Sequence, residues 1–298
     1  MKNTRTVMTS AVLLLAVLFT ASVFSLKKVE TLRGKEATLE EVLYLPSAKT
    51  LKRMSLGYTG LLADVYWTRA VQYFGNKVTL QQRSTRYDLL APLLEIATDL
   101  DPHLIVAYQD GSLFLSQEQP YGAGQPDKAV ALLEKGVRNN PRYWRLYFTL
   151  GFVHYLDRHD FKAAQKAFET GANVRGALPF MRVMAAKMAE NAQDLDTAVT
   201  LWQGIYESSK DKMVRNTAVK HLDSLHAESD IAELKRRIQL YQEKTGALPE
   251  TWLDLVRAGL LPGIPVDPSG APYELKRDGS VQVHDPGHFP FLGQILQK

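Results

Sequence analysis

The chain has 298 residues, of which 45% are hydrophobic and 23% are charged, and this composition excludes a disordered chain. It contains no cysteine, which excludes disulfides, thiolate zinc sites and a bacterial lipoprotein anchor. The formal net charge is +4, but residues 1 to 35 alone carry +5, so the rest of the chain is nearly neutral. Basic residues that flank an apolar run indicate a membrane surface, and we expect no nucleic-acid partner.

An apolar run from Val7 to Leu26 is about one bilayer thickness long and predicts a membrane anchor over residues 1 to 35. A cleaved signal peptide needs small residues at the end of such a run, and no A-x-A motif is present, so we favour an uncleaved anchor. Lys2 and Arg5 precede the run as a short basic head, although basic residues also follow it. We therefore expect a single-pass protein of the bacterial inner membrane that contacts the bilayer through residues 7 to 26, with its body in the periplasm.

Residues 36 to 84 predict a linker followed by an aromatic helix. A short helix is expected at Leu39 to Tyr44 within the linker. The segment from Leu61 to Phe74 is apolar on most of its circumference, so neighbouring helices or a partner must bury it. We favour packing on the helices that follow, and the alternative is a docking surface.

Small residues recur at a nearly constant interval in the middle of the chain. They are Ala129, Ala164, Ala198 and Ala232. A large apolar residue follows four positions after each of the first three, and glycines recur at Gly111 and Gly151. Such spacing suits two helices packed back to back, because a glycine permits close approach and a small alanine on the second helix receives it.

The stretch from Tyr143 to Thr170 carries this pattern most fully. Tyr147, Leu150, Gly151 and His154 occupy the positions of a W-x2-L-G-x2-Y signature, and Ala164 and Phe168 supply A-x3-F. Over residues 85 to 245 the chain resembles the tetratricopeptide repeat (TPR) family, which implies an all-α, TPR-like helical solenoid. A fourth copy, with Lys220 and Arg236 at packing positions, is degenerate, as is typical of a terminal repeat.

Residues 246 to 298 predict a small module that contains a helix and a β-hairpin. The helix is expected at Glu250 to Ala258, and two strands at Tyr273 to Lys276 and Ser280 to Val283. The motifs T-G-x-L-P and I-P-x-D-P-x-G-x-P-Y make these fifty residues similar to the C-terminal region of the major pseudopilins of type II secretion. That resemblance implies calcium-binding loop carboxylates, although turn-forming aspartates are the commoner explanation. The aspartates concerned are Asp267, Asp278 and Asp285.

No catalytic motif is present. The seven histidines include no H-E-x-x-H spacing, and the chain has no G-x-S-x-G, P-loop or dinucleotide-binding fingerprint. The pair His284 and His288 comes nearest to a metal site, and we interpret it as part of a turn. We therefore expect no enzyme activity, no cofactor, no metal and no small-molecule substrate.

The TPR resemblance also implies a partner-binding surface, because the first helix of each repeat lines the inner face at repeat positions 2, 5, 9 and 12. Aromatic side chains beside arginine are typical of interface hot spots, and the alternative is that neighbouring helices cover these aromatics. The expected partner-binding residues are Tyr108, Arg145, Phe148, Phe152, Tyr155, Phe180 and Lys187.

These features together predict a non-enzymatic, membrane-anchored scaffold that binds protein subunits of a bacterial envelope complex, such as a transporter, a secretion machine or a pilus system. The alternative is a periplasmic adaptor that holds a peptide or substrate for a secretion system, with the C-terminal module as its docking piece. A metal-dependent enzyme that uses the terminal histidines ranks third.

Overall fold

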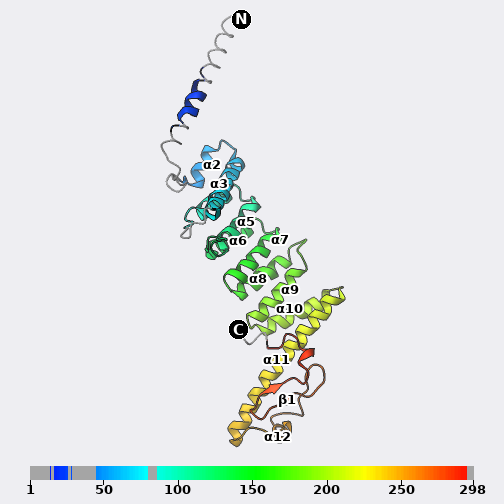
Figure 1. Cartoon of the computed structure of the whole chain (residues 1–298). Coiled ribbons are helices and arrows are strands. Elements are labelled where there is room, and N and C mark those ends of the chain that lie inside the picture. The colour runs from blue at the N-terminus through cyan, green and yellow to red at the C-terminus, as the bar shows by residue number, and fades with distance from the viewer. Residues whose placement is uncertain (1–13, 15–16, 26–27, 29–44, 80–85, 294–298) are drawn as a thin grey trace.

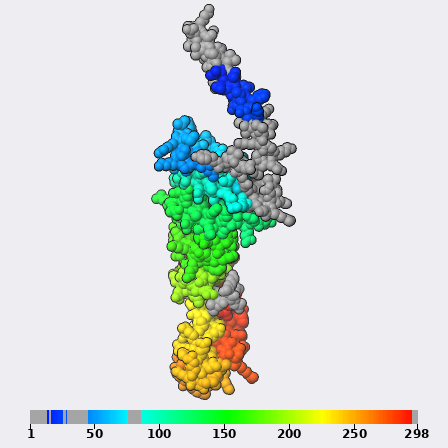
Figure 2. Space-filling model, turned by 90° about the vertical axis from the view of Figure 1, so that its left-hand side faces the viewer, coloured from blue at the N-terminus to red at the C-terminus, as the bar shows by residue number. Residues whose placement is uncertain are grey.

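The computed structural model describes Leu14, residues 17 to 25, Lys28, residues 45 to 79 and residues 86 to 293. This part of the chain is mostly helical, which confirms the all-α expectation in its coarse form. Helices follow one another along an elongated molecule, and a long helix leads to the C-terminal module (Figures 1 and 2). The elements are α2 (Ala48–Met54), α3 (Thr59–Thr79), α4 (Leu90–Leu100), α5 (Ile105–Ser116), α6 (Pro126–Asn139), α7 (Trp144–Phe152), the π-helical turn η2 (Val153–Asp157), α8 (Phe161–Ala172), α9 (Phe180–Asn191), α10 (Leu195–Ser208), α11 (Lys212–Thr245), α12 (Trp252–Arg257), β1 (Glu274–Leu275), β2 (Val281–Gln282) and the 3-10 turn η3 (Pro286–His288).

The membrane localisation expected from the sequence is corrected here. Within the described residues, no helix combines the length and the apolar character that crossing a bilayer requires. This finding contradicts the prediction of a single-pass inner-membrane protein with a periplasmic body. Residues 17 to 25 are helical, and apart from Leu14 the rest of the run from Val7 to Leu26 lies outside the described residues.

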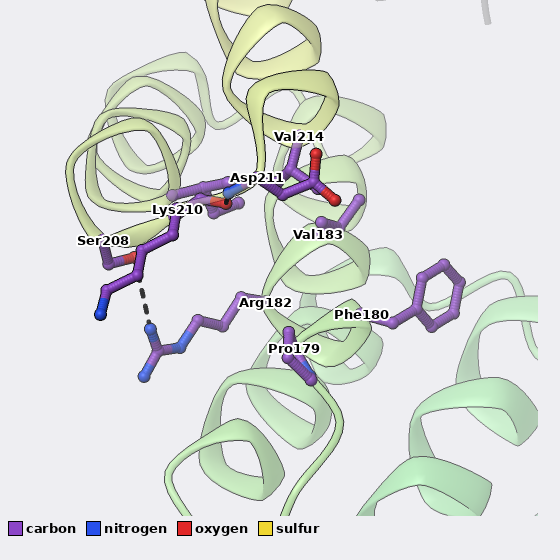
Figure 3. A pocket seen from close by; sticks show the side chains of 10 residues that line it. Pro179, Phe180, Arg182, Val183, Ser208, Lys210, Asp211 and Val214 are labelled. Atoms are coloured by element: carbon purple, nitrogen blue, oxygen red, sulfur yellow. Dashed lines mark hydrogen bonds between the residues drawn. The ribbon is translucent and has the colours of Figure 1, made fainter.

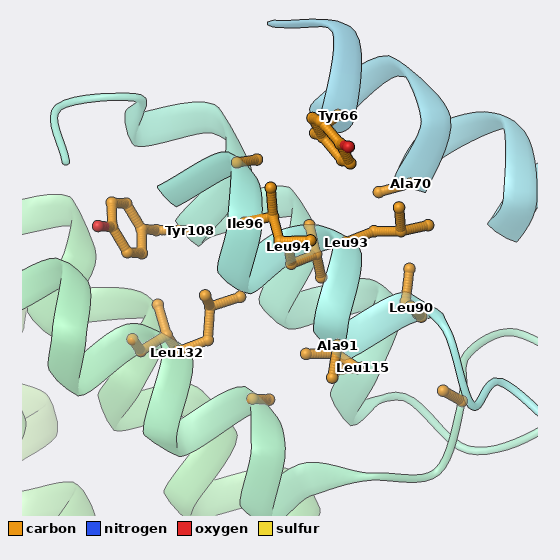
Figure 4. Packing of buried hydrophobic residues seen from close by; sticks show 14 of the residues in the cluster. Tyr66, Ala70, Leu90, Ala91, Leu93, Leu94, Ile96, Tyr108, Leu115 and Leu132 are labelled. Atoms are coloured by element: carbon orange, nitrogen blue, oxygen red, sulfur yellow. The ribbon is translucent and has the colours of Figure 1, made fainter. Parts of the chain in front are cut away.

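The aromatic helix α3 packs on α4. Both helices contribute to the hydrophobic core of the stack of helices that continues with α5 and α6. Tyr66 and Ala70 of α3 are buried against Leu90 and Leu93 of α4 (Figure 4). Helix α3 covers the predicted segment from Leu61 to Phe74, and it is held by neighbouring helices along this face. The short helix expected at residues 39 to 44 lies outside the described residues.

Helices α5 to α10 form three successive antiparallel hairpins, and each has a residue with a positive φ at the same place in its turn. Two residues before each second helix, the backbone has a positive φ: 62° at Gly124, 52° at His159 and 59° at Gln193. The second helices α8 and α10 then begin after Asp160 and Asp194, whose carboxylates accept hydrogen bonds from backbone N–H groups of the first helical turn. The hairpins therefore recur with the period seen in the alanines.

Glycines make the close contacts within the stack, as the repeat pattern predicts. A Cβ atom added to Gly151 of α7 would lie 2.7 Å from the ring of Phe168 on α8. Likewise, a Cβ atom on Gly136 of α6 would lie 2.8 Å from the ring of Tyr108 on α5. Both rings are fully buried, so neither helix pair has room for a side chain at these glycines.

The predicted fourth helix pair is replaced by one continuous 34-residue helix, α11. Ala227 stands where the earlier hairpins have His159 and Gln193, and it is a strong helix former that needs no left-handed backbone. The helix therefore runs on to Gly246, whose φ of 77° ends it. The second half of α11 contributes Leu234 and Ile238 to the hydrophobic core of the C-terminal module.

The C-terminal module contains the predicted helix and hairpin. Helix α12 buries Trp252, whose indole N–H donates to the carbonyl of Tyr273 at 2.7 Å. Strands β1 and β2 pair antiparallel, with Leu275 opposite Val281. Each candidate calcium ligand uses its Oδ1 atom to accept a hydrogen bond from a backbone N–H two residues ahead, which is the geometry of a turn. These ligands are Asp267, Asp278 and Asp285.

Candidate protein-binding surface

The predicted partner-binding residues lie mainly on the first helices of the second and third hairpins, α7 and α9. Helix α7 passes directly into the π-helical turn η2, in which the N–H of Arg158 bonds to the carbonyl of Val153, five residues back. This turn keeps Tyr155 on the same helical segment as Phe148 and Phe152. His154 points inward and is buried, and burial lowers the pKa of its imidazole.

Three aromatic side chains form a row along α7 and η2. The ring centroids of Phe148 and Phe152 are 4.8 Å apart, and those of Phe152 and Tyr155 are 6.5 Å apart. All three side chains are half-buried. The ring of Phe152 also meets the fully buried ring of Phe168 edge-on at 5.2 Å. The row therefore has one side against the core and one side partly exposed.

Arg145 begins this row and is exposed. Its guanidinium lies 4.9 Å from the ring centroid of Trp144 and 5.9 Å from that of Tyr143. These cation–π contacts orient the guanidinium plane without neutralising its charge. An orientated arginine beside aromatic rings suits a planar or acidic group on a partner.

Tyr108 is buried in the core, contrary to the expectation that it lines the surface. Its relative exposure is 0%, and its ring fills the space that Gly136 leaves open. The amide of Asn139 donates to its hydroxyl at 3.1 Å, and burial raises the pKa of the phenol. A repeat position alone did not reveal this, because the small residue that admits the ring lies on the next helix.

Phe180 and Lys187 lie on α9 and remain exposed. Phe180 is 49% exposed and lines a surface pocket of about 520 Å³ between α9, α10 and the start of α11 (Figure 3). Two cations at this pocket, Arg182 and Lys210, were not predicted from the sequence. The carboxylate of Asp211 also lines the pocket, but it accepts a hydrogen bond from the N–H of Met213 and so caps α11.

A buried polar cluster lies between α9, α10 and α11. One carboxylate oxygen of Glu190 accepts a hydrogen bond from the indole of Trp202 at 2.6 Å and lies 2.7 Å from Nδ1 of His221. The rings of Trp202 and His221 are stacked, with centroids 3.9 Å apart. Glu190 and His221 are distant in the sequence, and no local pattern indicates that they pair.

No protein-family model matches the chain, and no curated protein matches it either. The assignment of this surface therefore depends on its residues and their geometry.

Proposed function

We propose that this chain is a non-catalytic, TPR-like scaffold that binds protein partners through the first helices of its successive hairpins. The proposal rests on the repeat observed in this chain, and no matching family model or curated protein adds to it. It includes no membrane anchor, since that expectation is corrected above.

The recurring turn supports the repeat. Gly124, His159 and Gln193 follow one another at the same interval as the periodic alanines and all have a positive φ, although only the first is a glycine. Non-glycine residues adopt this conformation uncommonly, so its return at a fixed interval is more specific than a periodic hydrophobic pattern.

One observation carries the functional proposal: the half-buried row Phe148, Phe152 and Tyr155 continues from an exposed, orientated Arg145. The row packs against the α7–α9 core, so its open side is held in place before any partner arrives. Preordered aromatic anchors beside arginine give affinity with little loss of conformational freedom. The partner chemistry that fits is an apolar peptide segment that also carries carboxylates, because Arg182 and Lys210 line the pocket beside Phe180.

The test compares two double variants of the full chain as tagged bait in quantitative co-purification. The first, Arg145→Glu with Phe180→Ala, removes surface groups on α7 and α9. The control, Lys166→Glu with Leu253→Ala, changes the same types of residue elsewhere, and Leu253 is 48% exposed, close to the 49% of Phe180. A hot-spot truncation costs on the order of 2 kcal/mol, or about thirtyfold in affinity.

We expect at least one stoichiometric partner that the wild type and the control retain and the first variant loses. Partner profiles that are the same for the two double variants would contradict the proposed surface.

A further inference from the structure

The turn between α2 and α3 exposes a group of large apolar side chains, and it lies at the end of the helical stack away from the C-terminal module (Figures 1 and 2). We call this group the apolar tip. Its members and their exposed fractions are Met54 (69%), Leu56 (87%), Tyr58 (70%) and Leu61 (63%). In the described part of the chain, no other large hydrophobic side chain is as exposed as Leu56. Four such side chains within eight residues form a patch, and exposed apolar patches mark interaction surfaces.

The backbone of the turn holds the tip toward solvent. Leu56 has a φ of 48°, and Gly57 after it has a φ of 93°. A left-handed conformation is uncommon for a residue as large as leucine. The N–H of Tyr58 closes the turn by donating to the carbonyl of Ser55 at 2.8 Å, and Ser55 is buried. The chain therefore keeps a strained leucine at its most exposed turn, and such strain is typical of functional positions.

Three basic side chains stand directly before the tip. Lys49, Lys52 and Arg53 all lie on α2 and are exposed, and the last two belong to its final turn. None of the three forms an ion pair with another residue that the structure describes. Residues 45 to 68 contain one carboxylate, that of Asp64, so positive charge is in excess around the tip. These cations are therefore available to an anionic partner.

The arrangement matches the two layers of a bilayer surface. Apolar side chains at an interface enter the boundary of the acyl chains, while lysine and arginine stay level with the lipid phosphates. Lys52 and Arg53 precede Leu56 by four and three residues, or about 5–6 Å at the rise of a helix. This spacing fits the depth of about 5–10 Å that interfacial segments reach. Tyrosine, as at Tyr58, is enriched at this depth.

We propose that the apolar tip, together with Lys49, Lys52 and Arg53, binds the surface of a bilayer that contains anionic lipids. This contact is a shallow insertion of one turn, and it differs from the membrane-spanning anchor that is corrected above. It goes beyond the proposed function, because the tip belongs to α2 and α3. A tip bound to a membrane leaves α7 and α9, further along the stack, free to bind protein partners (Figure 1).

The test uses the lack of cysteine in the chain, which permits a single label at a chosen site. The full-chain variant Leu56→Cys carries the polarity-sensitive fluorophore nitrobenzoxadiazole and is titrated with vesicles of phosphatidylcholine mixed with anionic phosphatidylglycerol. We expect the emission to rise and to shift to shorter wavelength as the label leaves water. A label at Tyr58→Cys should respond in the same way. The control label at Leu253→Cys, on α12 of the C-terminal module and 48% exposed in the wild type, should not respond.

Charge variants of the labelled chain test the role of the cations. One Lys or Arg near an anionic surface contributes about fivefold in affinity, so Lys52→Gln with Arg53→Gln should bind the mixed vesicles about 25-fold more weakly. The control pair, Lys162→Gln with Lys166→Gln, removes two exposed charges from α8 and should stay within about twofold of the parent, because salt screens distant charges.

An unchanged label at residue 56 would overturn the proposal even if the chain sediments with the vesicles, because another segment would then make the contact. Equal responses to the mixed vesicles and to phosphatidylcholine alone would overturn it too, since the cations would have no role. A label that responds only to a co-purified protein would show that the tip docks on a protein and not on lipid. These results are independent of Arg145 and Phe180, so the proposed function would stand in each case.

Discussion

Replacing Gly171 with alanine should destabilise the protein, whereas the same replacement at Gly204 should stabilise it. A Cβ atom at residue 171, in α8, would lie 2.6 Å from Cβ of Tyr147 and would also overlap Cε of Met181. The methionine end can move, but Cβ of Tyr147 is bonded to the backbone of α7, so the two helices must separate. At Gly204, inside α10, no heavy atom lies within 4 Å of the added Cβ.

The magnitudes decide the two signs. Alanine gains at most about 1 kcal/mol over glycine in a helix interior, whereas overpacking a tight contact costs about 1–3 kcal/mol. We therefore expect Gly171→Ala to lose about 1–2 kcal/mol and Gly204→Ala to gain about 0.5–1 kcal/mol. At about 2–4 °C per kcal/mol, the melting temperature should fall by about 2–8 °C in the first variant and rise by about 1–4 °C in the second.

Thermal melting followed by circular dichroism at 222 nm measures both changes against the wild type in the same buffer. A melting temperature that rises in both variants would refute the close α7–α8 contact. A fall in both would show that Gly204 has a neighbour that the structure does not place there.

Two further predictions concern single carboxylates. Asp160→Ala should cost about 1 kcal/mol, because its Oδ1 accepts from the N–H of Ala163 at 3.0 Å and caps α8, while Asp110→Ala on an exposed part of α5 should stay within about 0.5 kcal/mol of the wild type. Glu228→Gln should raise the melting temperature at pH 7. Burial raises the pKa of Glu228 above its ordinary value of 4.5, so the stability it gives is present below pH 4.5 and is lost as the pH rises through the folded-state pKa. The advantage of glutamine should therefore vanish in melts below pH 4.5, and an advantage that is constant with pH would contradict this reasoning.

The sequence predicted the hairpins well because their packing signals are local. Ala164 and Ala198 are fully buried, and Gly151 makes the close contact expected from its position. The same signal failed at Ala232, because a periodic alanine indicates a packing face but does not reverse the chain. Reversal also needs a residue that accepts a positive φ followed directly by a capping residue, as at His159-Asp160, whereas the equivalent positions here hold Ala227 and Glu228.

The candidate site could be predicted only in part, because its contacts join distant segments. Phe148, Phe152 and Tyr155 follow from helical spacing, but the half-buried state of Phe148 and Phe152 depends on Phe168 on the next helix. Phe291 and His221 lie far apart in the sequence, and nothing near either residue indicates the other.

The missing turn at Ala227 explains why Phe291 of the C-terminal segment can reach His221. Because α11 does not turn back, one helix carries His221 in its first half and Leu234 of the module core in its second half. These residues are 13 positions apart, or about 20 Å along the helix axis. The module folds back along α11, with Phe289 in its core and Phe291 on His221.

Had the fourth hairpin formed, its second helix would pack against the first half of α11, and the module core would begin elsewhere. A substitution that restores the turn, such as Ala227→Gly with Glu228→Asp, should therefore weaken both the module and the Phe291 contact together, whereas Phe291→Ala affects the contact alone.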